Sequence, residues 1–340
     1  MRLHVRTCTL ELREPFVIAR SSDLEAQVVQ VAIEHDRLVG YGEAAPQEHY
    51  GESVESARDF LERAEPLLGD DPLAIAAVMA RLDALGRELA ARCALDGALH
   101  DLLGKLCGYP LWRLLGLEPA PPPTSYTISI DTLEGTADRV RRARGYRALK
   151  IKLGGPEDIE RVRIAAREAP VARIRVDANE AWSPETITEA MPELQTLGVE
   201  LVEQPLPAGS DEEYRRLHEL ALPIPIVLDE SCHTLPDVGR LAPLADGINI
   251  KLAKSGGIRE ALRMVHAARS VGLLVMLGCM NESSLGIAQG AQISPLVDVV
   301  DLDGHLLNRN DSFSGLELRD GAVVPGAGPG LGVTPLEPWP

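Results

Sequence analysis

Three carboxylates recur at an even spacing in the second half of this sequence. Asp177 and Glu203 are 26 positions apart, and so are Glu203 and Asp229. Clustered carboxylates repel one another unless a cation neutralises them. An all-oxygen set without His or Cys favours Mg²⁺, with Mn²⁺ also compatible, over Zn²⁺. We therefore predict a metal site at these acids, although any one of them alone would more often cap a helix or pair with a lysine.

Three lysines flank the acids in the sequence. Lys150 and Lys152 are two positions apart, so on a strand they point to the same face. Neighbouring cations and a bound metal both lower a lysine pKa, which would make Lys152 a base near neutral pH. Lys251 follows the third acid and is predicted to lie across the metal from Lys152. Two lysines on opposite faces of one carbon suit a racemase, whereas a lone strand-end lysine is usually a surface ion pair.

Short apolar segments alternate with amphipathic helical stretches after residue 123, and the acids and lysines lie at their ends. Eight parallel strands joined by helices favour a closed (β/α) barrel, in which functional residues lie at the carboxyl ends of the strands. The predicted strands are residues 124–130, 148–153, 173–178, 200–203, 226–229, 247–251, 273–278 and 297–302.

The segments on either side of the barrel have a different pattern. Residues 28–33 and 38–43 predict a hairpin, and helical periodicity runs from about 53 to 115. A Pro-rich linker occupies 118–123, and the tail from 311 is rich in Gly and Pro. We expect an α+β capping domain at 1–120, a barrel domain at 121–310, and a C-terminal segment at 311–340 that packs back on the cap.

Composition narrows the possible partners and compartment. The 340 residues carry a net charge of −17, which makes nucleic acid and anionic membranes poor partners. No apolar run approaches the ~20 residues of a membrane span. The five cysteines show no metal or disulfide spacing, and the N-terminus lacks the apolar core of a signal peptide. We expect a cytoplasmic protein.

The ordered set of motifs resembles the muconate-lactonizing-type subgroup of the enolase superfamily. The segments that carry the resemblance are Lys150-x-Lys152, Asp177-x-Asn179, Glu203-Gln204-Pro205, Asp229-Glu230-Ser231 and Lys251-x-x-Lys254-x-Gly256-Gly257. The resemblance implies a modified TIM barrel, (β/α)7β, with an N-terminal α+β cap completed by the C-terminal tail. It also implies Mg²⁺ held by Asp177, Glu203 and Asp229, with Lys152 and Lys251 as the acid/base pair. Lys150 would assist, and Asn179, Glu230 and Lys254 would support these groups.

Within that subgroup, Asp301-x-Asp303 resembles the end of the last strand of the dipeptide epimerases. Two acids on one strand face can bind the free ammonium of a dipeptide by charge-assisted hydrogen bonds, although an ordinary turn at Asp303-Gly304 is the alternative. The segment 278–284 is also similar to the family's dipeptide-site loop, which implies substrate contacts for Cys279, Met280 and Asn281.

The cap segment 15–20 bears on the choice of substrate. Arg20 matches an arginine that pairs with the glutamate side chain in Ala-Glu epimerases, although it could be an ordinary exposed arginine. Glu48 and Glu52 nearby would instead favour a cationic side chain. The loop 21–26 departs from the family's arginine-bearing loop, and its Asp23 and Glu25 argue against an acidic ligand.

We therefore expect a Mg²⁺-dependent isomerase that moves a proton at the alpha carbon of the C-terminal residue of an L,X-dipeptide. L-Ala-D/L-Glu from murein peptides is one such substrate, and we expect a homo-oligomer. An o-succinylbenzoate synthase, an N-acylamino acid racemase or a muconate cycloisomerase would use the same metal and lysines without needing Asp301 and Asp303. A barrel that binds metal or peptide without turnover would not need the two lysines.

Overall fold

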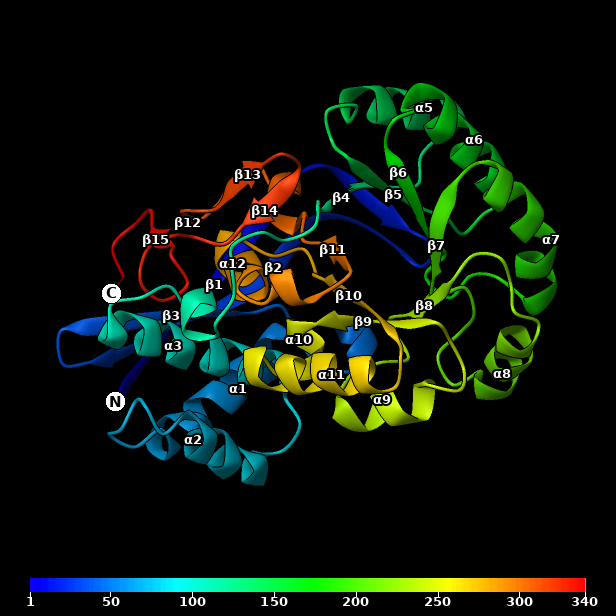
Figure 1. Cartoon of the computed structure of the whole chain (residues 1–340). Coiled ribbons are helices and arrows are strands. Elements are labelled where there is room, and N and C mark those ends of the chain that lie inside the picture. The colour runs from blue at the N-terminus through cyan, green and yellow to red at the C-terminus, as the bar shows by residue number, and fades with distance from the viewer. Residues whose placement is uncertain (340) are drawn as a thin grey trace.

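Eight short parallel strands form the barrel in the computed structural model, which describes residues 1–339 (Figure 1). Each strand pairs with its neighbours in chain order. A parallel bridge between Thr124 and Val300 closes the ring, and Leu302 N donates to Thr124 Oγ1 at 2.8 Å. The strands are β4 (Ser125–Ile128), β5 (Ala148–Lys152), β6 (Arg173–Asp177), β7 (Val199–Glu203), β8 (Ile226–Leu228), β9 (Gly247–Lys251), β10 (Leu274–Gly278) and β11 (Val299–Asp301).

Helices follow the first seven barrel strands, so the predicted (β/α)7β fold is confirmed. Local sequence fixes where several of them begin. Ser183 caps α7 by accepting from Thr186 N, and Thr234 forms a capping box with Asp237 at the start of α9. The helices are α5 (Leu133–Arg142), α6 (Asp158–Glu168), α7 (Pro184–Thr196), α8 (Asp211–Glu219), α9 (Leu235–Leu241), α10 (Leu252–Ser255), α11 (Ile258–Ser270) and α12 (Ser284–Ala291).

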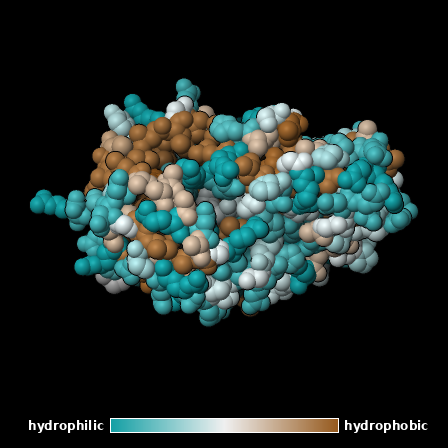
Figure 2. Space-filling view, turned by 90° about the horizontal axis from the view of Figure 1, so that it is seen from below, coloured by the Kyte–Doolittle hydropathy of each residue, from teal (hydrophilic) through white to brown (hydrophobic). Residues whose placement is uncertain are grey.

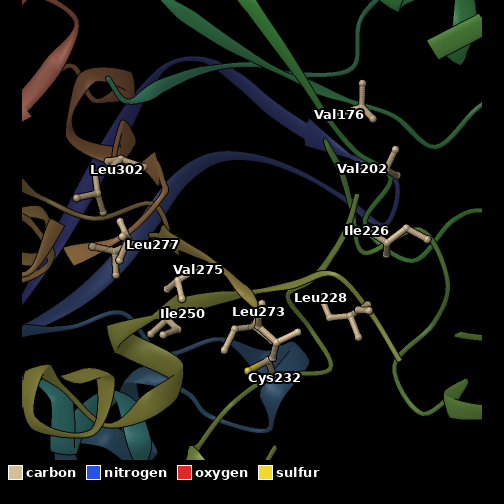
Figure 3. Close-up of a cluster of buried hydrophobic side chains, with 14 of the residues drawn as sticks. Val176, Val202, Ile226, Leu228, Cys232, Ile250, Leu273, Val275, Leu277 and Leu302 are labelled. Atoms are coloured by element: carbon tan, nitrogen blue, oxygen red, sulfur yellow. The ribbon is translucent and has the colours of Figure 1, made fainter. Parts of the chain in front are cut away.

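Alternation along the strands separates the hydrophobic layer from the polar interior. Ile151 lies in the main hydrophobic cluster, whereas Lys150 and Lys152 on either side of it are buried polar residues. Val176 and Ile250 belong to the same layer, which Figure 3 shows in part. The layer fixes the strand register, so it also fixes which side chains reach the barrel mouth.

The cap is an antiparallel sheet covered by helices. Strands β1 (Arg2–Ile18), β2 (Ser21–His35) and β3 (Leu38–Ala44) pair in that order. Helix α3 (Leu89–Cys107) lies so close to β3 that a Cβ at Gly42 would stand 1.9 Å from Ala94 O. The remaining cap elements are η1 (Glu48–Tyr50), α1 (Val54–Ala64), η2 (Glu65–Leu67), α2 (Ile75–Leu82), η3 (Asp83–Leu85) and α4 (Leu111–Leu114).

The C-terminal segment contacts the cap. The rings of Tyr41 and Phe313 lie 5.4 Å apart, edge to face, and Leu331 N donates to Asp101 Oδ1 at 2.8 Å. Boundaries at 120 and 310 stay a prediction. The elements after β11 are η5 (Gly304–Leu307), β12 (Phe313–Ser314), β13 (Glu317–Arg319), β14 (Ala322–Val324) and β15 (Thr334–Pro335), and η4 (Ser294–Leu296) precedes it.

The molecular surface fits the composition. Figure 2 shows a face that is mostly hydrophilic, with hydrophobic patches gathered toward one end. Over residues 1–339, the helices are too short or too polar to cross a bilayer.

Candidate active site

Three neighbouring strands bring the three predicted metal ligands together. Asp177 ends β6, Glu203 ends β7, and Asp229 directly follows β8. Asp177 and Glu203 are paired across the two strands, and Glu203 pairs with Val227 on the next. All three side chains are buried at the mouth of the barrel. The regular strand spacing in the sequence therefore becomes side-by-side placement in space.

Lysine ammonium groups contact these acids. Lys150 Nζ lies 3.0 Å from Asp177 Oδ2 and 2.7 Å from Glu203 Oε2. Lys251 Nζ lies 2.8 Å from Asp229 Oδ2. Burial alone raises the pKa of Asp177 and of Asp229, but the lysines outweigh it and hold both pKa values below their usual range. Burial and the charge of Asp177 instead raise the pKa of Glu203 to about 7.

The donor set fits a divalent cation that prefers oxygen. Among residues 1–339, Glu203 Oε2 and both carboxylate oxygens of Asp229 accept no hydrogen bond, although lysine ammonium groups lie within ion-pair distance of them. Buried carboxylate oxygens of this kind are the ligands that Mg²⁺ takes. Within residues 1–339, no three His, Cys, Asp or Glu side chains are grouped as a metal cluster, and Asp177 and Asp229 are paired with lysines. The fit rests on the chemistry of the three oxygen donors.

Lys152 and Lys251 approach the site from opposite sides of the barrel. Lys152 lies on β5 and Lys251 on β9, four strands apart in a ring of eight, and both line the same cavity. Lys152 Nζ donates to Asp177 Oδ2 at 2.7 Å and to Asn179 Oδ1 at 3.1 Å. A carbon atom held between the two amines is accessible to one proton donor or acceptor on each face.

Carboxylates raise the pKa values of Lys150 and Lys251, whereas the lower lysine pKa expected beside a bound metal stays a prediction. Burial alone lowers the pKa of Lys251, but Asp229 outweighs burial and holds it well above its usual range. Asp177, Asp301 and Glu203 do the same to Lys150. The charges nearest to these two lysines in the fold are carboxylates.

Asp301 and Asp303 stand at the end of β11 on the other side of Lys150. Lys150 donates to Asp301 Oδ2 at 2.9 Å, and Asp301 Oδ1 is buried without a hydrogen-bond partner among residues 1–339. Thr127 N donates to Asp303 at 2.6 Å. Burial, followed by the charge of Asp301, raises the pKa of Asp303 to about 7. A further positive charge placed beside this buried pair of acids would therefore stabilise it.

A cavity of about 790 Å³ joins these groups to the cap. The loop after β10 lines it with Cys279, Met280 and Asn281, whose contacts with substrate stay a prediction. A Cβ at Gly304 would stand 2.5 Å from Met280 O, so only glycine lets that loop pack against the end of the barrel. Cap residues of β1, β2 and η1 form the opposite wall.

Arg20 reaches from the cap to two acids of the barrel. Its guanidinium donates to Glu230 Oε1 at 2.9 Å and to Glu180 Oε2 at 3.4 Å. Arg20 also lines the cavity. The predicted glutamate receptor is thus already paired with carboxylates of the protein itself.

The three predicted supporting residues lie beneath the acids and lysines. Asn179 Nδ2 donates to Glu230 Oε1 at 3.1 Å. Lys254 Nζ donates to Cys232 O at 2.6 Å and to Asn249 O at 2.9 Å. It also lies 2.6 Å from Asp229 Oδ1, so it fixes the loop that carries this acid.

Two family models together match most of the sequence. The mandelate racemase/muconate lactonizing enzyme N-terminal domain matches residues 2–116, and the enolase C-terminal domain-like model matches residues 133–339. The chain belongs to the mandelate racemase/muconate lactonizing enzyme family. The resemblance inferred from the motifs is therefore confirmed.

Relatives within this family differ in the side chains that their names specify. The L-Ala-D/L-Glu epimerase of Bacteroides thetaiotaomicron is 38% identical over 95% of this chain and 85% of its own length. The hydrophobic dipeptide epimerase of Roseobacter litoralis is 37% identical over 98% of each chain. A solved structure, the dipeptide epimerase from Methylococcus capsulatus complexed with Mg and L-Arg-D-Lys, has a TM-score of 0.90 and 36% identity, covering 97% of this chain and 98% of that one.

Several site residues of this family member escaped the sequence analysis. Asn249 donates to Glu203 Oε1 at 2.9 Å, and its position two residues before Lys251 on one strand is a signal that would have found it. His49 lies 3.1 Å from Glu180, and the Tyr50 ring packs edge-on against His233 at 4.8 Å. No local pattern marks these cap residues, because their role depends on how the cap docks.

Proposed function

We propose that the protein is a Mg²⁺-dependent dipeptide epimerase that inverts the alpha carbon of the C-terminal residue of an L,X-dipeptide. Its relatives are named dipeptide epimerases, and several solved neighbours contain Mg and a dipeptide. The buried acids, the two opposed lysines and the acid pair at β11 support the same reaction.

Asp177, Glu203 and Asp229 would hold Mg²⁺, or Mn²⁺ in its place, through carboxylate oxygens. When bound, the cation supplies positive charge that stabilises the negative charge developing on the substrate carboxylate. Lys150 lies against two of these acids and against Asp301, so it holds them in place. Asn179, Glu230 and Lys254 orient the neighbouring groups through the contacts described above.

Lys152 and Lys251 would move the proton. One lysine must be a neutral amine that removes the alpha proton, and the other an ammonium that delivers a proton to the opposite face. Reversing the two roles converts the product epimer back. A protein that binds peptide without turnover does not need two lysines on opposite faces of one carbon.

The unpartnered Asp301 Oδ1 is the observation that carries the dipeptide assignment. A free ammonium placed at Asp301 and Asp303 supplies the cation that this buried pair lacks. Substrates of an o-succinylbenzoate synthase, an N-acylamino acid racemase or a muconate cycloisomerase carry no free ammonium there. The dipeptide reading therefore explains two acids that these alternatives leave unused.

A comparison of free and acetylated dipeptides tests this assignment. The protein is incubated with Mg²⁺ and either L-Ala-L-X or N-acetyl-L-Ala-L-X, and inversion at the C-terminal residue is followed by proton NMR. We expect inversion of the free dipeptide and a loss of at least about tenfold in kcat/KM on acetylation, since one charge-assisted hydrogen bond contributes ~1.5–3 kcal/mol. Equal turnover of both would favour an acylamino acid racemase.

We also propose that the protein is located in the cytoplasm. The five cysteines at positions 8, 93, 107, 232 and 279 are free, which suits a reducing cytoplasm. We also propose that the chain forms a homo-oligomer. Sedimentation velocity at micromolar concentration tests it, and a purely monomeric species would contradict it.

A further inference from the structure

The cavity has one cation on its cap side, and that cation is already paired. Among residues 1–339, four Lys or Arg side chains line the cavity: Lys150, Lys152 and Lys251 from the barrel, and Arg20 from the cap. Glu230 is almost fully buried, and Arg20 holds its carboxylate at 2.9 Å. Moving Arg20 to a substrate carboxylate would leave Glu230 buried beside Asp229 without this partner, which is costly.

Carboxylates without basic partners line the same cap wall. Asp23 and Glu25 come from β2, Glu48 from η1, and Glu55 from the start of α1. In the chain through residue 339, none of these four lies within 4.0 Å of a Lys, Arg or His nitrogen. Glu52 is different, because it accepts from Leu89 N and Ala90 N and so caps α3. The cap wall is therefore acidic after its internal contacts are counted.

The inner end of the cavity sets the direction in which a bound dipeptide would lie. Asp301 lines the cavity, is 4% exposed, and has one carboxylate oxygen without a hydrogen-bond partner in the part of the chain that the structure describes. With the dipeptide ammonium at Asp301 and the alpha carbon between Lys152 and Lys251, the remaining space for the C-terminal side chain lies along the cap. That side chain would meet the free carboxylates at the cap wall.

We propose that the epimerase is selective for a cationic C-terminal side chain, lysine or arginine, and disfavours glutamate. Arg20 is then a positioning residue that ties β1 to Glu230 and Glu180, and it does not bind the substrate. This inference rests on the proposed function and specifies its substrate class.

The test compares L-Ala-L-Lys, L-Ala-L-Gln and L-Ala-L-Glu by kcat/KM for inversion. We expect Lys to exceed Gln by about fivefold to tenfold and Glu to be the poorest, since each exposed ion contact contributes modestly and several carboxylates act together. Raising the salt concentration should narrow the Lys-to-Gln ratio, because these charges are solvent-exposed. A preference for Glu over Lys, or equal use of all three, would overturn the inference while leaving the epimerase assignment intact. Inversion of no dipeptide would overturn the proposed function and this inference together.

Two variants separate the acids from Arg20. Glu25→Gln combined with Glu48→Gln should reduce the Lys-to-Gln ratio severalfold. The matched double variant Glu189→Gln with Glu219→Gln removes two exposed acids outside the cavity and should keep the ratio. Arg20→Gln should lower kcat/KM for Lys and Glu dipeptides by similar factors. A loss confined to the Glu dipeptide would show that Arg20 is the substrate receptor and would contradict the proposal.

Discussion

Lys152 and Lys251 face one cavity from β5 and β9, half-way around a ring of eight strands. This opposition gives each amine access to one face of a bound carbon. The ring of Phe16 lies on the cap side of one of them, with Lys152 Nζ 5.8 Å from its centre. The arrangement predicts that the two lysines have distinct stereochemical roles.

Replacing either lysine should uncouple inversion from proton exchange. We expect Lys152→Ala or Lys251→Ala to reduce inversion by about 10²–10⁴-fold, the usual contribution of a positioned acid or base. The remaining lysine should still exchange the alpha proton of one epimer with solvent. NMR in D₂O with L,L- and L,D-dipeptides shows which epimer each variant still exchanges. Equal residual exchange of both epimers in both variants would contradict opposed roles for the two lysines.

Replacing the acids at β11 should weaken substrate binding more than the chemical step. Asp301→Asn and Asp303→Asn remove charge at the ammonium site but keep the side-chain shape. We expect KM to rise about tenfold or more in each, with a smaller change in kcat. Steady-state kinetics provide the measurement, and an unchanged KM in both variants would remove the basis for the ammonium site.

Lys150 should stabilise the fold because it is buried among three carboxylates. Lys150→Met leaves Asp177, Glu203 and Asp301 without their shared cation. We expect a loss of about 3–5 kcal/mol in the free energy of unfolding, measured by urea denaturation in EDTA. Mg²⁺ at 100 times its Kd should stabilise the wild type by ~2.7 kcal/mol. Wild-type stability independent of Mg²⁺ would contradict the proposed ligands.

Glu282, a buried carboxyl group that is not a proposed metal ligand, predicts that stability depends on pH. Burial raises the pKa of Glu282 from 4.5 to about 8. The folded state therefore binds more protons than the unfolded state between these values, so this group's contribution to stability is lost as pH rises from about 4.5 to 8. Glu282→Gln should be more stable than the wild type at pH 9, by an amount on the order of 2 kcal/mol. Identical pH profiles from pH 5 to 9 would contradict it.

The strand-end residues could be predicted because barrel geometry maps sequence spacing onto space. Each predicted barrel strand is found, with bounds that differ by a few residues at most. Asp177, Glu203 and Lys251 are the last residues of their strands, as predicted. The partners of Arg20 could not be predicted, because Glu180 lies 160 positions away and follows a turn. Asn179 and Glu180 both adopt positive φ, at 42° and 72°, which a residue-type pattern does not indicate.

Contacts with α3 determine the role of one of the cap acids. Glu52 stood beside Glu48 as a possible receptor for a cationic side chain, yet it caps α3 at residues 89 and 90. Its distance of 37 positions from that helix start hides the role in sequence. Burial then raises its pKa to about 7. The charge available to substrate is thus set by tertiary contacts rather than by composition.

Solvent isotope incorporation tests the central claim most directly. The protein is incubated with Mg²⁺ in D₂O and a panel of L,L-dipeptides that includes Ala-Lys, Ala-Glu, Ala-Leu and Arg-Lys, and mass and stereochemistry are determined. We expect one deuterium from solvent to replace the alpha proton of the C-terminal residue, which adds about one dalton per molecule and inverts that carbon. Absence of deuterium from every dipeptide would contradict removal and return of the alpha proton by Lys152 and Lys251.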